Sequence, residues 1–191
     1  MSSRLLRDMT AILMGSGLFG IGTMAENPVI SHRHLADPNG FVYNGRLYAI
    51  TSNDDENKAG YDMIGSVLIS TKDFVNWSDH GEVYYSKKDT KWAGAAYAPT
   101  AVPRDGKIFY YIPNNAGGVG VLVADKPEGP LKDPLGKGLI TGSLCDGVAW
   151  CFDPGIFVDD DGQAYLVWGG GSNSTYSYGN NIRIIKVNRD M

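Results

Sequence analysis

The chain contains 191 residues, 43% of them hydrophobic, which suffices for one domain with a buried core but is short for two. Charged residues make up 20%, and the formal net charge of −4 argues against a protein that binds the phosphate backbone of nucleic acids. Glycine accounts for 25 residues and aromatic residues for 11%, and this glycine share is roughly twice the average of about 7%. We therefore expect many tight turns between aromatic strands, and an all-β fold.

Residues 1–26 differ from the rest of the chain. Arg4 and Arg7 precede a mostly apolar run over residues 10–25 that ends in small residues. This pattern resembles a secretory signal peptide, although Asp8 and several glycines weaken the match, and a buried N-terminal segment is the alternative. We expect a secreted or periplasmic protein if the segment is a leader and a cytoplasmic one otherwise. The run is too short and too interrupted to span a membrane, so no membrane partner is expected.

From residue 27 onward, short apolar runs alternate with turn signals, and a repeat emerges. The three repeats are Asp37-Pro38 followed by Asn44-Gly45, Ala98-Pro99 followed by Asp105-Gly106, and Asp153-Pro154 followed by Asp161-Gly162. The prolines are 61 and 55 residues apart, and the distances from proline to glycine are 7, 7 and 8 residues. Asn-Gly and Asp-Gly between β-rich runs predict hairpins with type I′ turns, in which both central residues have positive φ. Each unit is therefore expected to open with a hairpin.

A third apolar run follows each hairpin, at residues 65–70, 118–124 and 181–187, and fourth segments are expected near residues 77–83 and 131–140. Small antiparallel sheets repeated in this way indicate the blades of a β-propeller. A two-sheet sandwich is the alternative, but it does not explain the shared register. Three blades cannot close a ring, so we expect a fragment, a split polypeptide, or completion by self-association or a complementary chain that covers the open edges.

The innermost strand of each propeller blade lines a central channel, so the first residues of successive inner strands converge at one mouth. Asp37, Ala98 and Asp153 share that position. Two carboxylates facing one space can perform acid–base chemistry, because a close like-charged pair stabilises a proton on one member. An Asp before Pro also simply starts a turn, which is the alternative for either residue alone.

Three motifs carry a resemblance to a known family. Residues 34–40 (HLADPNG), 97–99 (YAP) and 151–162 (CFDPGIFVDDDG) resemble the inner-strand motifs of glycoside hydrolase family 43. These are five-bladed propeller enzymes that act on arabinoxylan, arabinan and xylo-oligosaccharides. The likeness runs from about residue 27 to residue 191 and implies a partial propeller domain over 27–191, covering roughly the first three blades, with an oligosaccharide or polysaccharide as its substrate.

The resemblance also implies roles. Asp37 corresponds to the general base that activates water, and Asp153 to the residue that orients the general acid and keeps it protonated, in a reaction that inverts the anomeric configuration. The family's acid, a glutamate, opens the fourth blade. The glutamates of this sequence, Glu26, Glu56, Glu82 and Glu128, do not open an inner strand. Loss of a general acid costs about 10²- to 10⁴-fold in rate, so we expect the isolated chain to be nearly inert on ordinary substrates.

Sugar binding needs flat apolar faces for the ring and short polar groups for the hydroxyls. Trp92, Tyr97 and Phe152 flank the channel motifs and can supply such faces, and Asn53 and Asp54 follow the first hairpin and can meet hydroxyls. Core packing is the alternative for all of these residues, and it is the interpretation we adopt for two further tryptophans, Trp77 and Trp168.

Three other functions stay open. The motif Asp37-Pro38-Asn39-Gly40 also resembles the invertase-like family, whose aspartate is a nucleophile and whose reaction retains configuration. A carbohydrate-binding propeller without catalysis would keep the aromatic residues and lack the acid. A protein-interaction propeller would need neither aspartate.

No metal or cofactor is expected. Cys145 and Cys151 match no zinc spacing, and they are either joined in a local disulfide or, in the simpler interpretation, left as free thiols. Asp159-Asp160-Asp161 lacks the ligand spacing of a calcium loop, and the glycines at 117–120 lack the strand-to-helix setting of a phosphate loop.

Overall fold

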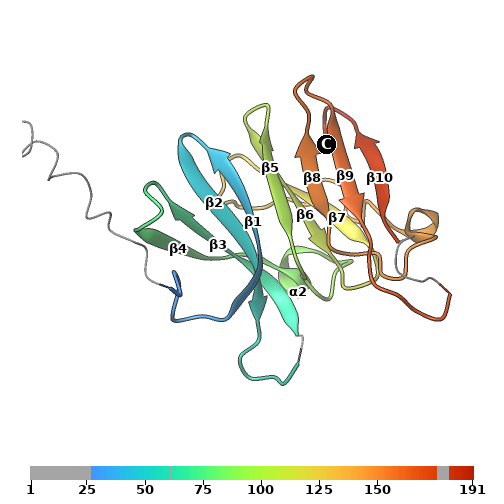
Figure 1. Ribbon diagram of the computed structural model, residues 1–191, viewed down its shortest axis with the longest axis horizontal. Helices are drawn as coiled ribbons and strands as arrows, with labels where there is room; N and C mark the ends of the chain where they lie inside the picture. The colour runs from blue at the N-terminus through green and yellow to red at the C-terminus, as the bar shows by residue number, and fades with distance from the viewer. Residues whose placement is uncertain (1–26, 61, 176–180) are drawn as a thin grey trace, which may run out of the picture.

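The computed structural model describes residues 27–60, 62–175 and 181–191, so the segment that resembles a signal peptide lies outside the described residues. Figure 1 shows antiparallel strands gathered into sheets that lie side by side in chain order. The strands are β1 (Leu35–Tyr43), β2 (Arg46–Asp54), β3 (Met63–Thr71), β4 (Trp77–Tyr85), β5 (Thr100–Arg104), β6 (Lys107–Pro113), β7 (Val119–Ala124), β8 (Gly155–Val158), β9 (Ala164–Trp168) and β10 (Arg183–Val187). A helical turn α2 (Ser86–Asp89) follows β4, and a 3-10 turn η1 (Gly142–Cys145) precedes β8.

The described strands form one four-stranded sheet in the order β1-β2-β3-β4 and two three-stranded sheets, β5-β6-β7 and β8-β9-β10. The all-β prediction is confirmed, and the two-sheet sandwich is wrong. Each sheet is an antiparallel meander, because hairpin connections join its consecutive strands. None of the helices in the described part of the chain has the length and apolar character that crossing a membrane would require.

The first two hairpins have the turns that the sequence predicts. Asn44 and Gly45 have φ of 48° and 71°, and Asp105 and Gly106 have φ of 48° and 74°, as type I′ turns require. The prediction of the same turn in the third hairpin is wrong. There the backbone N–H of Gly162 donates to the carbonyl of Asp159, and only the glycine of the Asp161-Gly162 pair has positive φ. Five residues, 159–163, separate β8 from β9, whereas two residues separate the strands of each of the first two hairpins, so a two-residue type I′ turn does not form here.

The fourth segments also differ between the sheets. Residues 77–83 lie in β4, as expected. Residues 131–140 form no regular strand, and they pair with β7 only at two isolated bridges, Lys132 with Val123 and Ile140 with Val119. Pro130 and Pro134 flank the first bridge, and a proline offers no N–H for a continuous ladder.

The middle sheet is buried on both faces. Along β6, Ile108, Tyr110 and Ile112 pack into a core shared with the first sheet, whereas Phe109 and Tyr111 pack into a core shared with the third. Alternate residues of a strand point to opposite faces, so a continuous apolar run is what a doubly covered strand requires. The Tyr110 hydroxyl donates to the carbonyl of Pro127, and the Tyr111 hydroxyl to that of Met191. Burial raises the pKa of both phenols well above the usual value.

This packing brings the first strand of each sheet beside the first strand of the next, because β1 contacts β5 and β5 contacts β8. Asn39 reinforces the first of these contacts. Its side-chain oxygen accepts a hydrogen bond from the Thr100 hydroxyl at 2.9 Å and one from the Ala101 N–H at 3.3 Å. The beginnings of the three strands therefore lie at the same end of the molecule.

Cys145 and Cys151 form a disulfide with a Cα–Cα distance of 5.3 Å, so the free-thiol interpretation is wrong. Cys145 ends η1, and Cys151 is held from the other side, since its carbonyl accepts the N–H of Gly118 at 3.1 Å. The spacing alone did not decide between bridge and thiols, because it is the turn at η1 and the pairing with the segment before β7 that bring the two Cα atoms together.

We expect the double variant Cys145→Ser, Cys151→Ser to be less stable than the native chain by roughly 2 kcal/mol, because a short cross-linked loop removes that much chain entropy from the unfolded state. Urea denaturation under non-reducing conditions measures the difference. Native protein unfolded in the presence of a reductant is the control, and it should approach the variant. Equal stability of the native protein and the variant under non-reducing conditions would contradict the bridge.

Candidate active site

Three strand openings share one unusual backbone conformation. Asp37, Ala98 and Asp153, each followed by a proline, have φ of 51°, 33° and 48°. Positive φ is uncommon for residues other than glycine and is tolerated best by Asn and Asp, so the alanine carries the clearest strain, of order 1 kcal/mol or more. A repeated conformation at matched positions of three sheets shows that the register predicted from the sequence is also a geometric register.

Asp37 lies in an irregularity of β1. The pairing of β1 with β2 is regular up to Ala36, opposite Ser52, and resumes at Asn39, opposite Ile50, so that Asp37 and Pro38 form a bulge. Bulges redirect side chains at the ends of sheets and beside active sites. The Asp37 side chain is exposed, and its Oδ2 accepts a hydrogen bond from the Ser52 hydroxyl at 3.0 Å.

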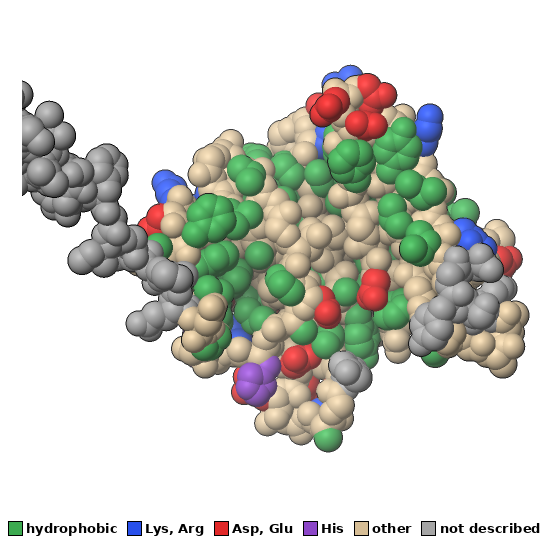
Figure 2. Space-filling view, viewed as in Figure 1, with side chains coloured by type: hydrophobic (Ala, Val, Ile, Leu, Met, Phe, Trp, Pro, Cys, Tyr) green, Lys and Arg blue, Asp and Glu red, His purple; other side chains and the backbone are tan. Residues whose placement is uncertain are grey.

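Asp153 opens the third sheet immediately before β8, and the pKa of its carboxyl is raised. Desolvation by surrounding protein atoms is the larger cause, and the negative charge of Asp37 is the second. The side chain is still accessible to solvent, so a ligand can reach it. Asp37 and Asp153 are 116 positions apart in the sequence. The contribution of the Asp37 charge to the raised pKa of Asp153 agrees with the contacts of β1 with β5 and of β5 with β8, which bring the two strand openings to the same end of the molecule. Figure 2 shows acidic side chains near the middle of one face of the molecule, among apolar and uncharged atoms.

The aromatic residues next to these openings have different surroundings. Tyr97, directly before Ala98, and Phe152, directly before Asp153, are half-buried. The Trp92 side chain is fixed by its neighbours. Its Nε1 donates a hydrogen bond to Asp133 at 2.8 Å. Its ring packs against Gly120, where an added Cβ would come within 2.0 Å of the ring. Trp92 therefore has the packed environment that the core-packing alternative predicts for it.

Trp150 is an exposed aromatic residue, close in the sequence to Asp153, that the sequence analysis missed. Its side chain is 43% exposed, and its ring stands edge-on to Phe152 with a centroid distance of 6.5 Å. The backbone of Gly171 packs against the indole, because an added Cβ there would lie 2.1 Å from its Cδ1. Trp150 lies three residues before Asp153 and just outside the motif at residues 151–162, and this proximity is the signal that could have found it.

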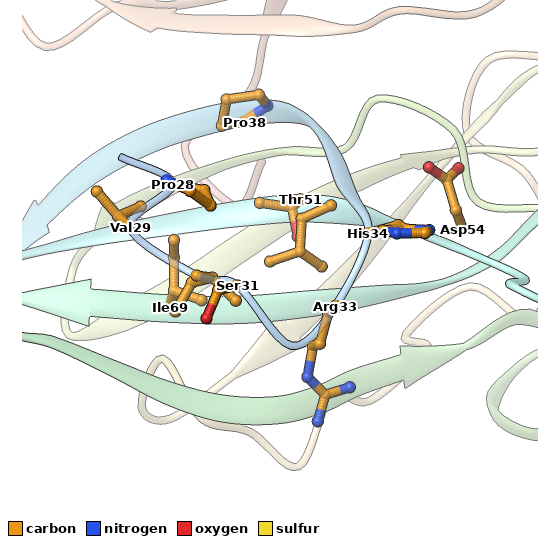
Figure 3. Close-up of a pocket in the computed structure, with 11 residues that line it drawn as sticks. Pro28, Val29, Ser31, Arg33, His34, Pro38, Thr51, Asp54 and Ile69 are labelled. Carbon is orange, nitrogen blue, oxygen red and sulfur yellow. The ribbon is translucent and has the colours of Figure 1, made fainter. Parts of the chain in front are cut away.

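Asn53 and Asp54 have surroundings separate from the two aspartates. The Asn53 amide donates to Glu82 Oε1 at 2.6 Å. Asp54 lines a cavity of about 570 Å³ on the outer face of the first sheet, together with His34, Pro38, Thr51 and Ile69 (Figure 3). Asp54 and Asn53 both line a second, more polar cavity of about 450 Å³. Neither Asp37 nor Asp153 lines these two cavities. Pro38, the residue after Asp37, lines the first cavity and is its nearest link in the chain to the strand opening.

In the part of the chain that the structure describes, no group of three or more His, Cys, Asp or Glu side chains is arranged to hold a metal ion. In the acidic loop of the third hairpin, carboxylate oxygens accept hydrogen bonds from backbone N–H groups of the same loop. Asp159 accepts the N–H of Asp160, and Asp161 accepts that of Gln163.

The chain is similar to known proteins of one family. The sequence model of glycosyl hydrolases family 43 matches residues 25–191. An arabinoxylan arabinofuranohydrolase from Bacillus subtilis is 40% identical over 87% of this chain and 38% of its own length. The crystal structure of a family 43 arabinoxylan arabinofuranohydrolase from Bacillus subtilis in complex with cellotetraose has a TM-score of 0.77 at 40% identity, over 87% of this chain and 40% of that one. An α-L-arabinofuranosidase from Clostridium thermocellum has a TM-score of 0.70 at 45% identity, over 86% of this chain and 55% of that one.

The chain belongs to glycosyl hydrolases family 43. It spans well under two thirds of the length of the Bacillus subtilis relative, 38%.

We expect Asp37→Asn to lower the pKa of Asp153, because it removes the negative charge that contributes to the upward shift. The shift should shrink without disappearing, since desolvation is its larger cause. Carboxyl ¹³C NMR titration of Asp153 in the two proteins measures the change. Asp160→Asn, an exposed carboxyl in the loop between β8 and β9, is the matched control and should leave Asp153 as it is. An unchanged titration in Asp37→Asn would show that the two carboxyl groups are not neighbours.

Proposed function

We propose that this protein hydrolyses O-glycosyl bonds of arabinose- or xylose-containing plant polysaccharides with inversion of configuration, as an α-L-arabinofuranosidase or β-xylosidase. The observation that carries the proposal is the electrostatic coupling between Asp37 and Asp153, whose raised pKa has burial and the Asp37 charge as its causes. Family membership supports the reaction class, and the names of the relatives support the substrate class.

In the proposed mechanism Asp37 is the general base. It takes a proton from a water molecule that attacks the anomeric carbon from the face opposite the leaving oxygen. Asp153 stands beside the leaving-group side, where it orients the general acid and favours its protonated form. Inverting enzymes separate base and acid by about 6.5 to 9.5 Å so that the water fits between them.

The general acid is a third carboxyl group. Of the described glutamates, Glu56 lies in the loop after β2, Glu82 accepts a hydrogen bond from Asn53, and Glu128 accepts one from Tyr48. None of these three opens the first strand of a sheet. We propose that the acid is supplied by a further sheet, in the same polypeptide or in a complementary chain, as part of a five-bladed propeller of which residues 27–191 form roughly three blades.

Sugar rings are proposed to stack on the aromatic side chains beside Asp153. Trp150 and Phe152 meet edge to face and lie three residues and one residue before Asp153 in the chain, so we propose that their accessible surfaces form a corner near its carboxyl group. Tyr97 adds a third aromatic group at the opening of the second sheet. The same corner would serve the second candidate function, a carbohydrate-binding propeller without catalysis, and the exposure of Trp150 is what favours that candidate.

Nitrophenyl pentosides distinguish these functions, because their leaving group departs without protonation and reports on the base alone. We expect the protein to hydrolyse the nitrophenyl α-L-arabinofuranoside or β-D-xyloside, and Asp37→Asn to lower the rate by about 10²- to 10⁴-fold. Asp160→Asn is the control and should keep the native rate. Proton NMR of the first-formed sugar should show inversion.

Three results would count against the proposal. Retention, with a glycosyl adduct trapped on Asp37, would favour the invertase-like mechanism. Hydrolysis that survives Asp37→Asn would remove the base from its role. Binding of arabinoxylan oligosaccharides in titration calorimetry, lost in Trp150→Ala and accompanied by no hydrolysis, would favour the carbohydrate-binding function.

We also propose that the outer face of the third sheet is covered by a further sheet or by a second copy of the chain. The third sheet lies at one end of the row of sheets (Figure 1), and its inner face is buried by Leu166 and Trp168. On the opposite face Phe157 is 58% exposed and Ile184 62% exposed, next to their cross-strand partners Tyr165 and Val167. An apolar sheet face of this kind associates in water unless it is covered.

We therefore expect the 191-residue chain to self-associate, and Ile184→Asp to reduce the association, because it places a charge in the apolar face. Light scattering over a concentration series measures both. Lys72→Asp, an exposed residue directly after β3 in the first sheet, is the control for a new acidic side chain outside this face and should leave the association unchanged. A native chain that stays monomeric over the whole series would contradict the proposal.

A further inference from the structure

Ser52 is a fully buried residue whose side chain connects two sheets. It lies in β2, opposite Ala36 in β1 and Ser66 in β3, and its relative exposure is 0%. A buried hydroxyl that lacks partners destabilises a protein, so its hydrogen bonds indicate what holds it in place. The two partners of Ser52 both belong to strand openings of the candidate active site.

The first partner is the backbone N–H of Ala98, which donates to Ser52 Oγ at 2.8 Å. The second is Asp37, whose Oδ2 accepts the Ser52 hydroxyl at 3.0 Å. A backbone N–H can only donate, so the single hydrogen of the hydroxyl is left for the carboxylate. The result is a directed chain of hydrogen bonds from the second sheet through Ser52 to the exposed carboxylate of the first.

This chain of hydrogen bonds restricts the rotamer of Asp37. The side chain is exposed, stands in a bulge and has no other hydrogen bond among those that the described residues make. A fixed orientation is what a general base requires, because its carboxylate must be directed at the water molecule that it activates.

The strained opening of the second sheet has a use in this arrangement. Ala98 has a φ of 33°, and it stands where the other two sheets have aspartates. Its contribution to the site is its backbone N–H, because an alanine has no other group that can donate a hydrogen bond.

We infer that Ser52 is a positioning residue for the proposed reaction, in which its hydroxyl, fixed by the N–H of Ala98, holds the Asp37 carboxylate in orientation. The inference rests on the proposed role of Asp37 as general base. Ser52 is fully buried, so it does not touch the sugar.

Ser66 provides a matched comparison. It faces Ser52 across the β2–β3 pair and is also 0% exposed, but its hydroxyl has no hydrogen-bond partner. Ser52→Ala and Ser66→Ala therefore remove the same atom from neighbouring buried positions, and only the first removes a donor to Asp37.

The experiment compares the native protein, Ser52→Ala and Ser66→Ala on a nitrophenyl pentoside. In Ser52→Ala we expect kcat to fall by about tenfold, because the carboxylate loses the hydrogen bond that directs it at the water molecule. KM should stay unchanged, since the sugar contacts remain. Ser66→Ala should keep the native kcat.

Two NMR observables test the link without any turnover. In Ser52→Ala the Ala98 amide should exchange with solvent at least about tenfold faster, because it loses its acceptor, and the carboxyl ¹³C signal of Asp37 should move. Neither should change in Ser66→Ala. If Ser52→Ala does not fold, Ser52→Cys serves instead, since a thiol keeps the shape of the residue but is a weak donor, and the same changes are expected in smaller measure.

The outcomes separate the inference from the proposed function. A native kcat in Ser52→Ala, with native Ala98 exchange, overturns the inference. If the native protein cleaves no pentoside, the proposed function fails, and the Ala98 and Asp37 signals alone decide whether Ser52 joins the two strand openings. If those signals change and kcat does not, the link is structural and the positioning role is wrong.

Discussion

The second sheet is buried on both faces, and the candidate active site depends on this packing. The first sheet packs against one face of the second sheet, around Tyr110 of β6. The third sheet packs against the other face, around Tyr111. Because both interfaces between the sheets are filled with packed side chains, the sheets cannot slide past one another. Strand β5 is therefore held between β1 and β8. The openings of the three strands then meet at one end, which is how residues of separate repeats share a site.

The meeting of these openings has an electrostatic consequence. Desolvation and the negative charge of Asp37 both raise the pKa of Asp153, because a proton on the Asp153 carboxyl group removes its charge. Asp37, in contrast, has the hydroxyl of Ser52 as a hydrogen-bond donor. The asymmetry comes from the surroundings, since both residues stand at the same position of their repeats and have nearly the same φ.

The family assignment and the geometry support each other at different levels. Similarity over 87% of the chain establishes the family and the general arrangement of sheets. The coupling of Asp37 with Asp153, the aromatic corner of Trp150 and Phe152, and the hydrogen bonds of Ser52 are features of this chain itself. The faces between consecutive sheets are buried, whereas the outer face of the third sheet exposes the apolar side chains of Phe157 and Ile184.

The sequence by itself determined the features that depend on neighbours along the chain. The Asn-Gly and Asp-Gly turns, the three hairpins and the all-β class follow from local backbone preferences, and the repeated register placed Asp37 and Asp153 at equivalent positions. The tertiary structure decided what depends on distance in space. It set the different turn at Asp161-Gly162 and joined Cys145 to Cys151. It also packed the Trp92 ring against Gly120 and left Trp150 exposed. It also gave Ser52 its two partners, because a serine within a strand carries no local signal of which sheet will approach it.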